Sequence, residues 1–293
     1  MGLITLTTDF GNKDHFVGSV KGALQNEIPN ANIIEISNEI SPFNIIEGAY
    51  IIENSYKSFP KGSIHILGVD SEKTPENKHL VMILDGHYFI CADNGIMSLV
   101  AKRIKPDKII EINIHNSNSS SFTVLDVFIK VAAHIYRGGS IDLVGNKIND
   151  LKELYDISPI LNDKKNEIIG NVIYIDNYEN VVTNISKTIF VKFGKSRSYT
   201  INARNYKFNS IVNSYSDSIK FEIKKELRKE EGKKIALFNK ANFLELAIYK
   251  SNPSVTGGAS SLFGLKYRDI ISIKFDWFLY KVLIRLFYIN VIF

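Results

Sequence analysis

The sequence has 293 residues, of which 45% are hydrophobic and 23% charged. This is the usual mixture of a globular protein and excludes a collagen-like chain, a disordered chain and a membrane bundle, while the length favours two domains. The net charge of +5 arises from 36 basic and 31 acidic residues that are scattered among one another, so we expect no nucleic-acid partner.

The chain has one cysteine, Cys91, so it can form no intramolecular disulfide and no multi-cysteine metal site. Because Cys91 ends an apolar run, we interpret it as a buried structural thiol rather than a nucleophile. The N-terminus shows no basic region followed by a long apolar stretch, so we expect no signal peptide. These features favour a reducing, cytoplasmic location.

The first half alternates short β-branched runs with helical patterns, which predicts an α/β domain with a central, mostly parallel sheet covered by helices. The predicted strands are residues 3–7, 32–37, 63–69, 80–84 and 87–91. The predicted helices are residues 15–25, 45–58, 96–103 and 124–136. Asp85-Gly86 predicts a two-residue hairpin turn, and Gly138 and Gly139 a helix stop.

After about residue 150 the pattern changes to short, β-rich runs separated by turns. A linker over residues 155–167 precedes runs at 168–175, 198–203 and 234–238. This predicts a smaller, mostly-β barrel or sandwich domain. We therefore expect domains at 1–155 and 168–276. No zinc-spaced Cys/His set and no glycine-rich phosphate loop is present, so no metal is expected.

Residues 277–293 form a strongly apolar tail that is interrupted by Lys281 and Arg285. The tail is barely long enough to span a bilayer, so membrane contact is disfavoured. An added strand or helix, or a segment foreign to the core fold, is the preferred interpretation.

The sharpest local motif is the run TTDFG at 7–11, followed by Asp14, where the first strand ends and a helix begins. Ligands bind at that edge of an open α/β sheet. A carboxylate at Asp9 can accept hydrogen bonds from both hydroxyls of a ribose, and one at Asp14 can meet an ammonium group. Spacing alone leaves an equal alternative, in which both carboxylates cap the helix.

Five motifs in order carry a family resemblance: TTDFGNKDHFVGSVKG at 7–22, GVDSE at 68–72, ADNGIMSL at 92–99, YIDNYENVVTNI at 174–185 and ALFNKANFLELAI at 236–248. Together they resemble the S-adenosylmethionine hydroxide adenosyltransferase family, which is related to fluorinase and chlorinase. The resemblance covers residues 3–275. It implies cleavage of S-adenosylmethionine by water to adenosine and methionine, with no cofactor.

The resemblance also implies a homotrimer in which each ligand lies between the first domain of one subunit and the second domain of the next. The first domain then carries the ribose and methionine side, with Asp9 on the ribose diol and Asp14 facing the methionine amino group. The second domain carries the adenine side, where Tyr178 stands at the position of an aromatic that can stack on the base. The other implied contacts of that domain are Asp176, Asn180, Asn184 and Asn239.

In the hydrolytic family an Asp, an Arg and a His hold the attacking water. Asp70 stands at the Asp position, but Asn77 falls at the Arg position and Thr123 at the His position. Lys78 or His79, one or two residues further on, is a candidate to supply the missing positive charge. The candidate catalytic residues are therefore Asp70, Lys78 and His79.

Three alternatives stay open at this point. Loss of the Arg and His positions is compatible with a non-catalytic binder of S-adenosylmethionine or adenosine, and a halide-using synthase shares the scaffold. A methyltransferase is disfavoured because that chemistry usually follows a glycine-rich loop. Of the other polar residues, His65 and His87 have structural explanations, and Asp93-Asn94-Gly95 is either a turn or a site wall.

Overall fold

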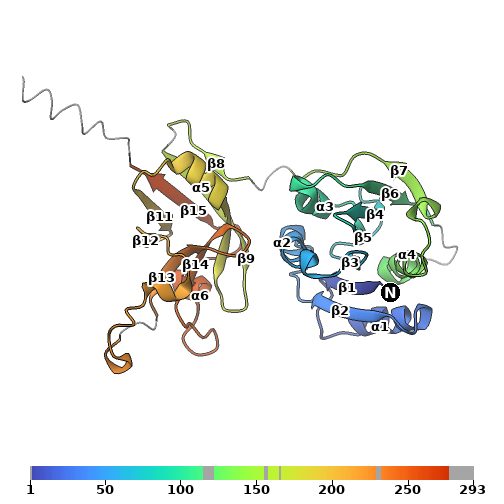
Figure 1. The fold of residues 1–293 in the computed structure, drawn as a ribbon, viewed down its shortest axis with the longest axis horizontal. Helices are drawn as coiled ribbons and strands as arrows, with labels where there is room; N and C mark the ends of the chain where they lie inside the picture. The colour runs from blue at the N-terminus through green and yellow to red at the C-terminus, as the bar shows by residue number, and fades with distance from the viewer. Residues whose placement is uncertain (1, 115–121, 155–157, 165, 229–231, 277–293) are drawn as a thin grey trace, which may run out of the picture. The chain divides into compact units, whose positions relative to one another are not determined.

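The computed structural model describes residues 2–114, 122–154, 158–164, 166–228 and 232–276. It divides into two compact units, Met1–Tyr155 and Asp156–Phe293 (Figure 1), and each is described by itself. The apolar tail at 277–293 lies outside the described residues. In the parts of the chain that are described, no helix combines the length and apolar character that crossing a bilayer requires.

The first unit is built on a seven-stranded sheet of order β2-β1-β3-β5-β4-β6-β7. β2, β1, β3 and β5 pair in parallel, and the remaining pairs are antiparallel, so that five strands share one direction and β4 and β7 oppose it. The strands are β1 (Leu3–Thr8), β2 (Asn32–Ser37), β3 (Ile64–Gly68), β4 (His79–Leu84), β5 (His87–Ala92), β6 (Lys108–Ile112) and β7 (Gly145–Ile148).

The reversal at β4 comes from the predicted hairpin. Asp85 and Gly86 both have positive φ, 50° and 74°, and Leu84 pairs with His87 across the turn. Two-residue turns of this kind match the twist of the flanking strands. The α/β unit expected from the sequence is therefore confirmed, and its sheet is mixed, because the pairs β5–β4, β4–β6 and β6–β7 are antiparallel.

Helices cover both faces of this sheet, and each face has its own apolar core (Figure 1). α1 (Phe16–Glu27) and α4 (Ile129–Tyr136) pack on one face, and α2 (Ile45–Ser55) and α3 (Ile96–Val100) on the other. Strand residues alternate between the two cores, as the period of a β-strand requires.

Three predicted helices are subdivided in the structure. The helix expected at 45–58 ends in a 3₁₀ turn, η1 (Tyr56–Ser58), and the one at 96–103 in another, η2 (Ala101–Arg103). The helix expected at 124–136 begins with a π-helical segment, η3 (Val124–Phe128), before α4. Such segments leave no mark in apolar periodicity, because each is only 3 or 5 residues long and a different period cannot be read over so few positions.

The second unit is an antiparallel, barrel-like sheet of order β12-β11-β15-β9-β10-β14-β13 with a main apolar core and a smaller apolar cluster on β13 and β14. Its strands are β9 (Glu167–Ile175), β10 (Val181–Ser186), β11 (Tyr199–Ala203), β12 (Tyr206–Phe208), β13 (Lys234–Phe238), β14 (Phe243–Ile248) and β15 (Ile270–Phe275). β9 holds the sheet together, because residues 167–171 pair with β15 and residues 172–175 with β10.

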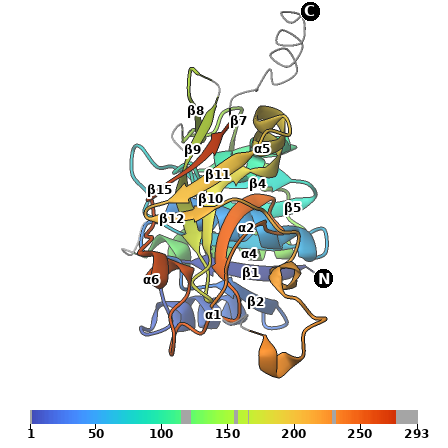
Figure 2. The same ribbon diagram turned by 90° about the vertical axis from the view of Figure 1, so that its left-hand side faces the viewer.

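Two helices lie at opposite ends of this sheet, α5 (Lys187–Gly194) and α6 (Ala259–Phe263) (Figures 1 and 2). The linker expected at 155–167 contains a short strand, β8 (Ile160–Leu161), which pairs with β9. Its two exposed residues gave no alternating apolar signal, which is why the sequence did not predict it. The 3₁₀ turns η4 (Ile141–Leu143), η5 (Tyr215–Ser218) and η6 (Lys225–Leu227) complete the described elements.

Candidate active site

Asp9 lies at the carboxyl end of β1 and ties together two neighbouring loops. Its Oδ2 accepts the backbone N–H of Phe43, at 2.9 Å, and that of Asp70, at 3.2 Å. Its Oδ1 makes no hydrogen bond with any other described residue, and the side chain is half-buried. One carboxylate oxygen therefore has a structural role, while the other has no hydrogen-bond partner among the described residues.

The capping alternative for Asp9 and Asp14 is wrong. Helix α1 begins at Phe16 after His15, and no side chain accepts a hydrogen bond at its N-terminus. Asp14 itself is exposed just before this helix and has no side-chain partner among the described residues. The Asp14 carboxylate is thus accessible for the contact with the methionine amino group that the resemblance implies.

Asp70 stands at the end of β3 with its backbone held on both sides. Its φ is 43°, its N–H reaches Asp9, and its carbonyl accepts the Asn94 side-chain amide at 3.1 Å. Asn94 is buried and also donates to the Val69 carbonyl at 2.9 Å. The half-buried Asp70 carboxylate makes no hydrogen bond or ion pair with the described residues, so its position is fixed through the main chain.

The next residue, Ser71, is held by two further side chains. Its carbonyl oxygen lies 3.0 Å from Nε2 of His79 and accepts the Thr123 hydroxyl at 2.9 Å. His79 is 1% exposed and packs against the Phe128 ring at 4.8 Å. Burial lowers the pKa of His79, so this imidazole is neutral at physiological pH and donates from Nε2.

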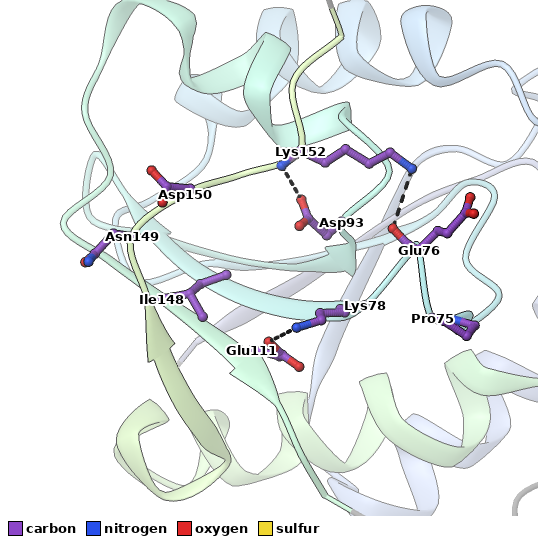
Figure 3. A pocket seen from close by; sticks show the side chains of 9 residues that line it. All are labelled: Pro75, Glu76, Lys78, Asp93, Glu111, Ile148, Asn149, Asp150 and Lys152. Carbon is purple, nitrogen blue, oxygen red and sulfur yellow. Dashed lines mark hydrogen bonds and ion pairs between the residues drawn. The ribbon is translucent and has the colours of Figure 1, made fainter.

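Lys78 contacts a different region. Its Nζ forms an ion pair with Glu111 of β6, at 2.7 Å, inside a pocket of about 580 Å³ (Figure 3). In the same pocket Lys152 donates its backbone N–H to Asp93 and its ammonium group to Oδ1 of Asn77. The contacts of Lys78 and His79 do not include the Asp70 carboxylate, and burial keeps His79 uncharged. The structure therefore does not bring the expected positive charge to Asp70.

An aromatic cluster lies next to the Asp9 and Ser71 segments. Phe10, which follows Asp9, packs edge-on against Phe122, which precedes Thr123, with ring centroids 5.2 Å apart. Phe16 completes the cluster at 5.3 Å from Phe122. A Cβ on Gly68 would approach Phe10 to 2.8 Å, so glycine at the end of β3 lets this ring pack closely. The cluster therefore packs the segment that follows Asp9 against the segment that precedes Thr123.

In the second unit, Tyr178 lies on the turn between β9 and β10 and is 63% exposed. Asp176 builds this turn: its Oδ1 accepts the N–H groups of Tyr178 and Asn180, and its Oδ2 accepts the Asn180 side-chain amide at 2.9 Å. The Asp176 and Asn180 side chains thus support the turn, and the Tyr178 ring is presented outward.

Glu179 anchors the same turn to α6. Its Oε2 accepts the backbone N–H of Gly258 at 2.7 Å, and also the hydroxyl and N–H of Ser261. These donors, the Ser261 hydroxyl first, hold the pKa of Glu179 below its usual value. Glu179 itself has φ of 59°, in the left-handed region, so the backbone turns sharply at the residue that follows Tyr178.

The two remaining asparagines also have internal partners. Asn184 accepts the Asn171 N–H at 2.8 Å. Asn239 uses Oδ1 to accept two backbone N–H groups of the β13–β14 turn and Nδ2 to donate to Glu245 at 3.1 Å. Glu245 is buried, which raises its pKa. Both asparagines therefore hold the backbone of the second unit, Asn184 at β9 and Asn239 at the β13–β14 turn.

Sequence reasoning missed Phe43, Ser71 and the link from Asn94 to Asp70. Phe43 has φ of 61° and a ring that is 72% exposed, although its N–H is bound by Asp9. No local signal identifies a backbone group as a partner, so only the folded chain reveals these contacts. In the described ranges, no group of three or more His, Cys, Asp or Glu side chains is arranged to hold a metal ion.

The two units define a class of protein: an α/β unit with carboxylates at the ends of adjacent parallel strands, followed by an antiparallel β unit with an exposed aromatic turn. The family model of the SAM hydroxide adenosyltransferase N-terminal domain matches residues 4–145, and that of the C-terminal domain matches residues 170–272. The chain belongs to the SAM hydroxide adenosyltransferase family.

Known relatives agree. The chain is 33% identical over 279 residues to an (R)-S-adenosyl-L-methionine hydrolase of Methanocaldococcus jannaschii, covering 93% of this chain and 96% of the relative. A Salinispora arenicola protein of the same name is 22% identical over 61% of this chain and 70% of its own length.

Solved structures share the fold. The crystal structure of an uncharacterized conserved protein from Thermotoga maritima matches with a TM-score of 0.77 at 26% identity, over 93% of this chain and 100% of that one. A conserved hypothetical protein from Thermus thermophilus matches with a TM-score of 0.67 at 18% identity, over 94% and 100%, which supports the fold alone.

Proposed function

We propose that this protein hydrolyses S-adenosylmethionine to adenosine and L-methionine. The observation that carries the proposal is the 3.2 Å hydrogen bond from the Asp70 N–H to the Asp9 carboxylate, in a chain that matches both domains of the family. This bond places the carboxylate proposed for the ribose directly beside the residue proposed for the water.

The reaction makes modest chemical demands. A water oxygen forms a bond to C5′ while the bond from C5′ to the sulfonium breaks, and its electron pair stays on the sulfur of methionine. The leaving group is a neutral thioether, so no general acid and no Lewis acid are needed. Asp70 orients the water in line and accepts its proton. We expect no cofactor, and a chelator to leave the rate unchanged.

Substrate binding is divided between the units. We assign the ribose hydroxyls to Oδ1 of Asp9, which the protein leaves unoccupied, and the methionine amino group to the exposed Asp14. We assign adenine to the Tyr178 ring, whose exposed face suits stacking on a base. Asp176 and Asn180 then act by holding the turn under this ring.

We also propose a homotrimer in which the two sides of each site come from different subunits. Mixing Asp9→Ala and Tyr178→Ala variants tests this at substrate concentrations far below KM. In trimers that reassemble at random from equal amounts of the two variants, about one site in four combines an intact first domain with an intact second domain. Activity therefore recovers to about one quarter of wild type. If each subunit contains its own complete site, mixing restores nothing.

The test of the activity is incubation of purified protein with each sulfonium epimer of S-adenosylmethionine, followed by chromatography for adenosine and methionine. The curated relatives are named for the (R) epimer, so we expect faster turnover of that epimer. We place the enzyme in the cytoplasm, in keeping with its single, buried cysteine.

A second candidate function is a non-catalytic binder of the same ligand. The observation in its favour concerns the residues at the family Arg and His positions. The Asn77 side-chain oxygen accepts a hydrogen bond from Lys152, and the Thr123 hydroxyl donates one to the Ser71 carbonyl. Among the described residues, neither side chain contacts the Asp70 carboxylate. Calorimetric binding of S-adenosylmethionine with no adenosine above the spontaneous background supports the binder.

A further inference from the structure

We infer that His79 and Thr123 are positioning residues that fix Asp70 through the carbonyl of Ser71. The inference deepens the proposed function and depends on it for its catalytic part. It gives His79 a role as a neutral hydrogen-bond donor, in place of the charge that the sequence suggested.

The first support is that the Asp70–Ser71 backbone is held at three polar groups. The Asp70 N–H is bound by Asp9, the Asp70 carbonyl by Asn94, and the Ser71 carbonyl by both His79 and Thr123. The Asp70 carboxylate, in contrast, has no partner among the described residues. Its direction is therefore set only by the backbone that these side chains hold.

The second support is the conformation of Asp70. Its φ of 43° lies in the left-handed region, which is unfavourable for a residue with a side chain unless the surroundings impose it. Two hydrogen bonds to the following carbonyl are a direct means of imposing it. Without them, only the bonds from Asp70 to Asp9 and Asn94 still hold this backbone, and we expect the carboxylate to shift from the in-line position.

The third support is that one element organises both donors. Thr123 directly precedes the π-helical segment η3, and Phe128, the last residue of η3, packs on the His79 ring. π-Helical turns are rare and occur often at functional sites. The segment thus sets the Thr123 hydroxyl and the His79 imidazole on the same carbonyl from two directions.

The imidazole is suited to this role and not to proton transfer. His79 is buried on β4, and within the described residues its Nδ1 has no hydrogen-bond partner. Donation from Nε2 to a carbonyl leaves Nδ1 as the unprotonated nitrogen. A buried, neutral ring with one donor in use positions a neighbour without exchanging protons.

The test compares Thr123→Val, which removes only the hydroxyl, with Thr123→Ser, which keeps it, and uses Thr188→Val on exposed α5 as the control. We expect Thr123→Val to lower kcat by about tenfold with little change in KM, because the lost contact acts on the water-holding residue and not on the substrate. Thr123→Ser restores kcat, and Thr188→Val has no effect.

His79 is tested in the same way with His79→Phe and His79→Gln, the latter retaining an N–H donor at a similar reach. Loss of both donors, in His79→Phe with Thr123→Val, should lower kcat by more than the product of the single effects, because each donor compensates for the other. Thr123→His, which introduces the family residue, should also lower kcat. A rise in kcat for Thr123→His contradicts the positioning role.

Amide hydrogen exchange of residues 68–77 gives a readout that does not require turnover. We expect Thr123→Val and His79→Phe to raise exchange of this segment by about tenfold, and Thr188→Val to leave it unchanged. Unchanged exchange overturns the inference. Raised exchange with an unchanged kcat overturns the catalytic part of the inference. An inactive wild type overturns the proposed function. The exchange result still decides in that case whether His79 and Thr123 hold the Asp70–Ser71 backbone.

Discussion

Lys78 and His79 are adjacent in sequence, but their side chains leave the sheet on opposite faces. Lys78 pairs with Glu111, whereas His79 reaches the Ser71 carbonyl and the Phe128 ring. This follows from the alternation of side chains along a strand. Of the two residues that the sequence offered as a source of charge, only His79 contacts the Asp70–Ser71 segment, through the Ser71 carbonyl, and it is uncharged.

The first prediction separates the two faces. Lys78→Ala should keep kcat within about twofold of wild type, because its ion pair is half-exposed and such pairs contribute only about 0–1 kcal/mol. The control is Lys21→Ala, which breaks the comparable pair with Glu35 on the same unit. Steady-state kinetics in which Lys78→Ala loses far more activity than Lys21→Ala would place the catalytic charge in the pocket of Figure 3.

The second prediction concerns the double use of the Asp9 carboxylate. Asp9→Ala should weaken S-adenosylmethionine binding by about tenfold or more and also lower kcat, because Oδ1 loses the ribose and Oδ2 releases the Asp70 N–H. Calorimetry and single-turnover assays measure the two effects separately. Unchanged affinity contradicts the ribose assignment, and unchanged turnover of bound substrate contradicts the coupling to Asp70.

Asp14→Ala serves as the comparison for that experiment. Asp14 is exposed and is assigned to the methionine amino group, so its loss should weaken S-adenosylmethionine by several-fold and leave adenosine affinity unchanged. Equal losses for both ligands would show that Asp14 does not contact methionine.

The third prediction tests the aromatic turn of the second unit. Tyr178→Ala should weaken adenosine binding by about tenfold, within the range for loss of a stacked base, and Tyr178→Phe should bind as wild type because the ring is retained. Glu179→Gln should weaken it less, by loosening the anchor to Gly258 and Ser261. If Tyr178→Ala binds adenosine normally, adenine is held elsewhere.

How far the sequence predicts this protein depends on whether a contact is local. The hairpin at Asp85-Gly86, the first five strands and the helices of the first unit follow from patterns of a few residues and were predicted correctly, whereas β6 and β7 were not predicted. Asp9 was placed at the correct edge of the sheet, but its partners Phe43 and Asp70 lie 34 and 61 residues away. No period or motif in the sequence reports such a bond.

Thr123 shows why the catalytic residues were harder to predict. Its position suggested only the loss of a family histidine, because the sequence does not reveal the carbonyl that its hydroxyl binds. Lys78 likewise has the charge that the family residue would have, but it precedes β4 and its side chain pairs with Glu111 instead of reaching the Ser71 segment. The sequence identified the residue types at these positions, but it did not predict which groups their side chains contact.

The fourth prediction concerns acid sensitivity of the first unit. His65 is buried between Thr5 and His87, with its Nδ1 2.7 Å from the Thr5 hydroxyl, and burial lowers its pKa to about 3. The unfolded chain binds a proton near pH 6.5 and the folded chain does not, so stability is complete above pH 6.5 and falls as the pH drops toward 3.

We expect His65 to contribute a loss of about 2–3 kcal/mol in the free energy of unfolding between pH 7.5 and 4.5. Urea unfolding of wild type and His65→Phe at both pH values isolates this contribution, with exposed His15→Ala as the control. The variant should lose less stability on acidification than wild type. The same loss in both proteins would mean that His65 is protonated in the folded state.

The most direct measurement is the yield of adenosine and methionine from S-adenosylmethionine, compared between wild type and Asp70→Asn. We predict equimolar products from wild type at a rate above the spontaneous background. Asp70→Asn should lower turnover by at least about 100-fold and bind the substrate nearly as well, because Asp70 acts on the water mainly in the transition state. Wild-type protein that binds S-adenosylmethionine and releases no adenosine, or an Asp70→Asn variant with the wild-type rate, would contradict this account.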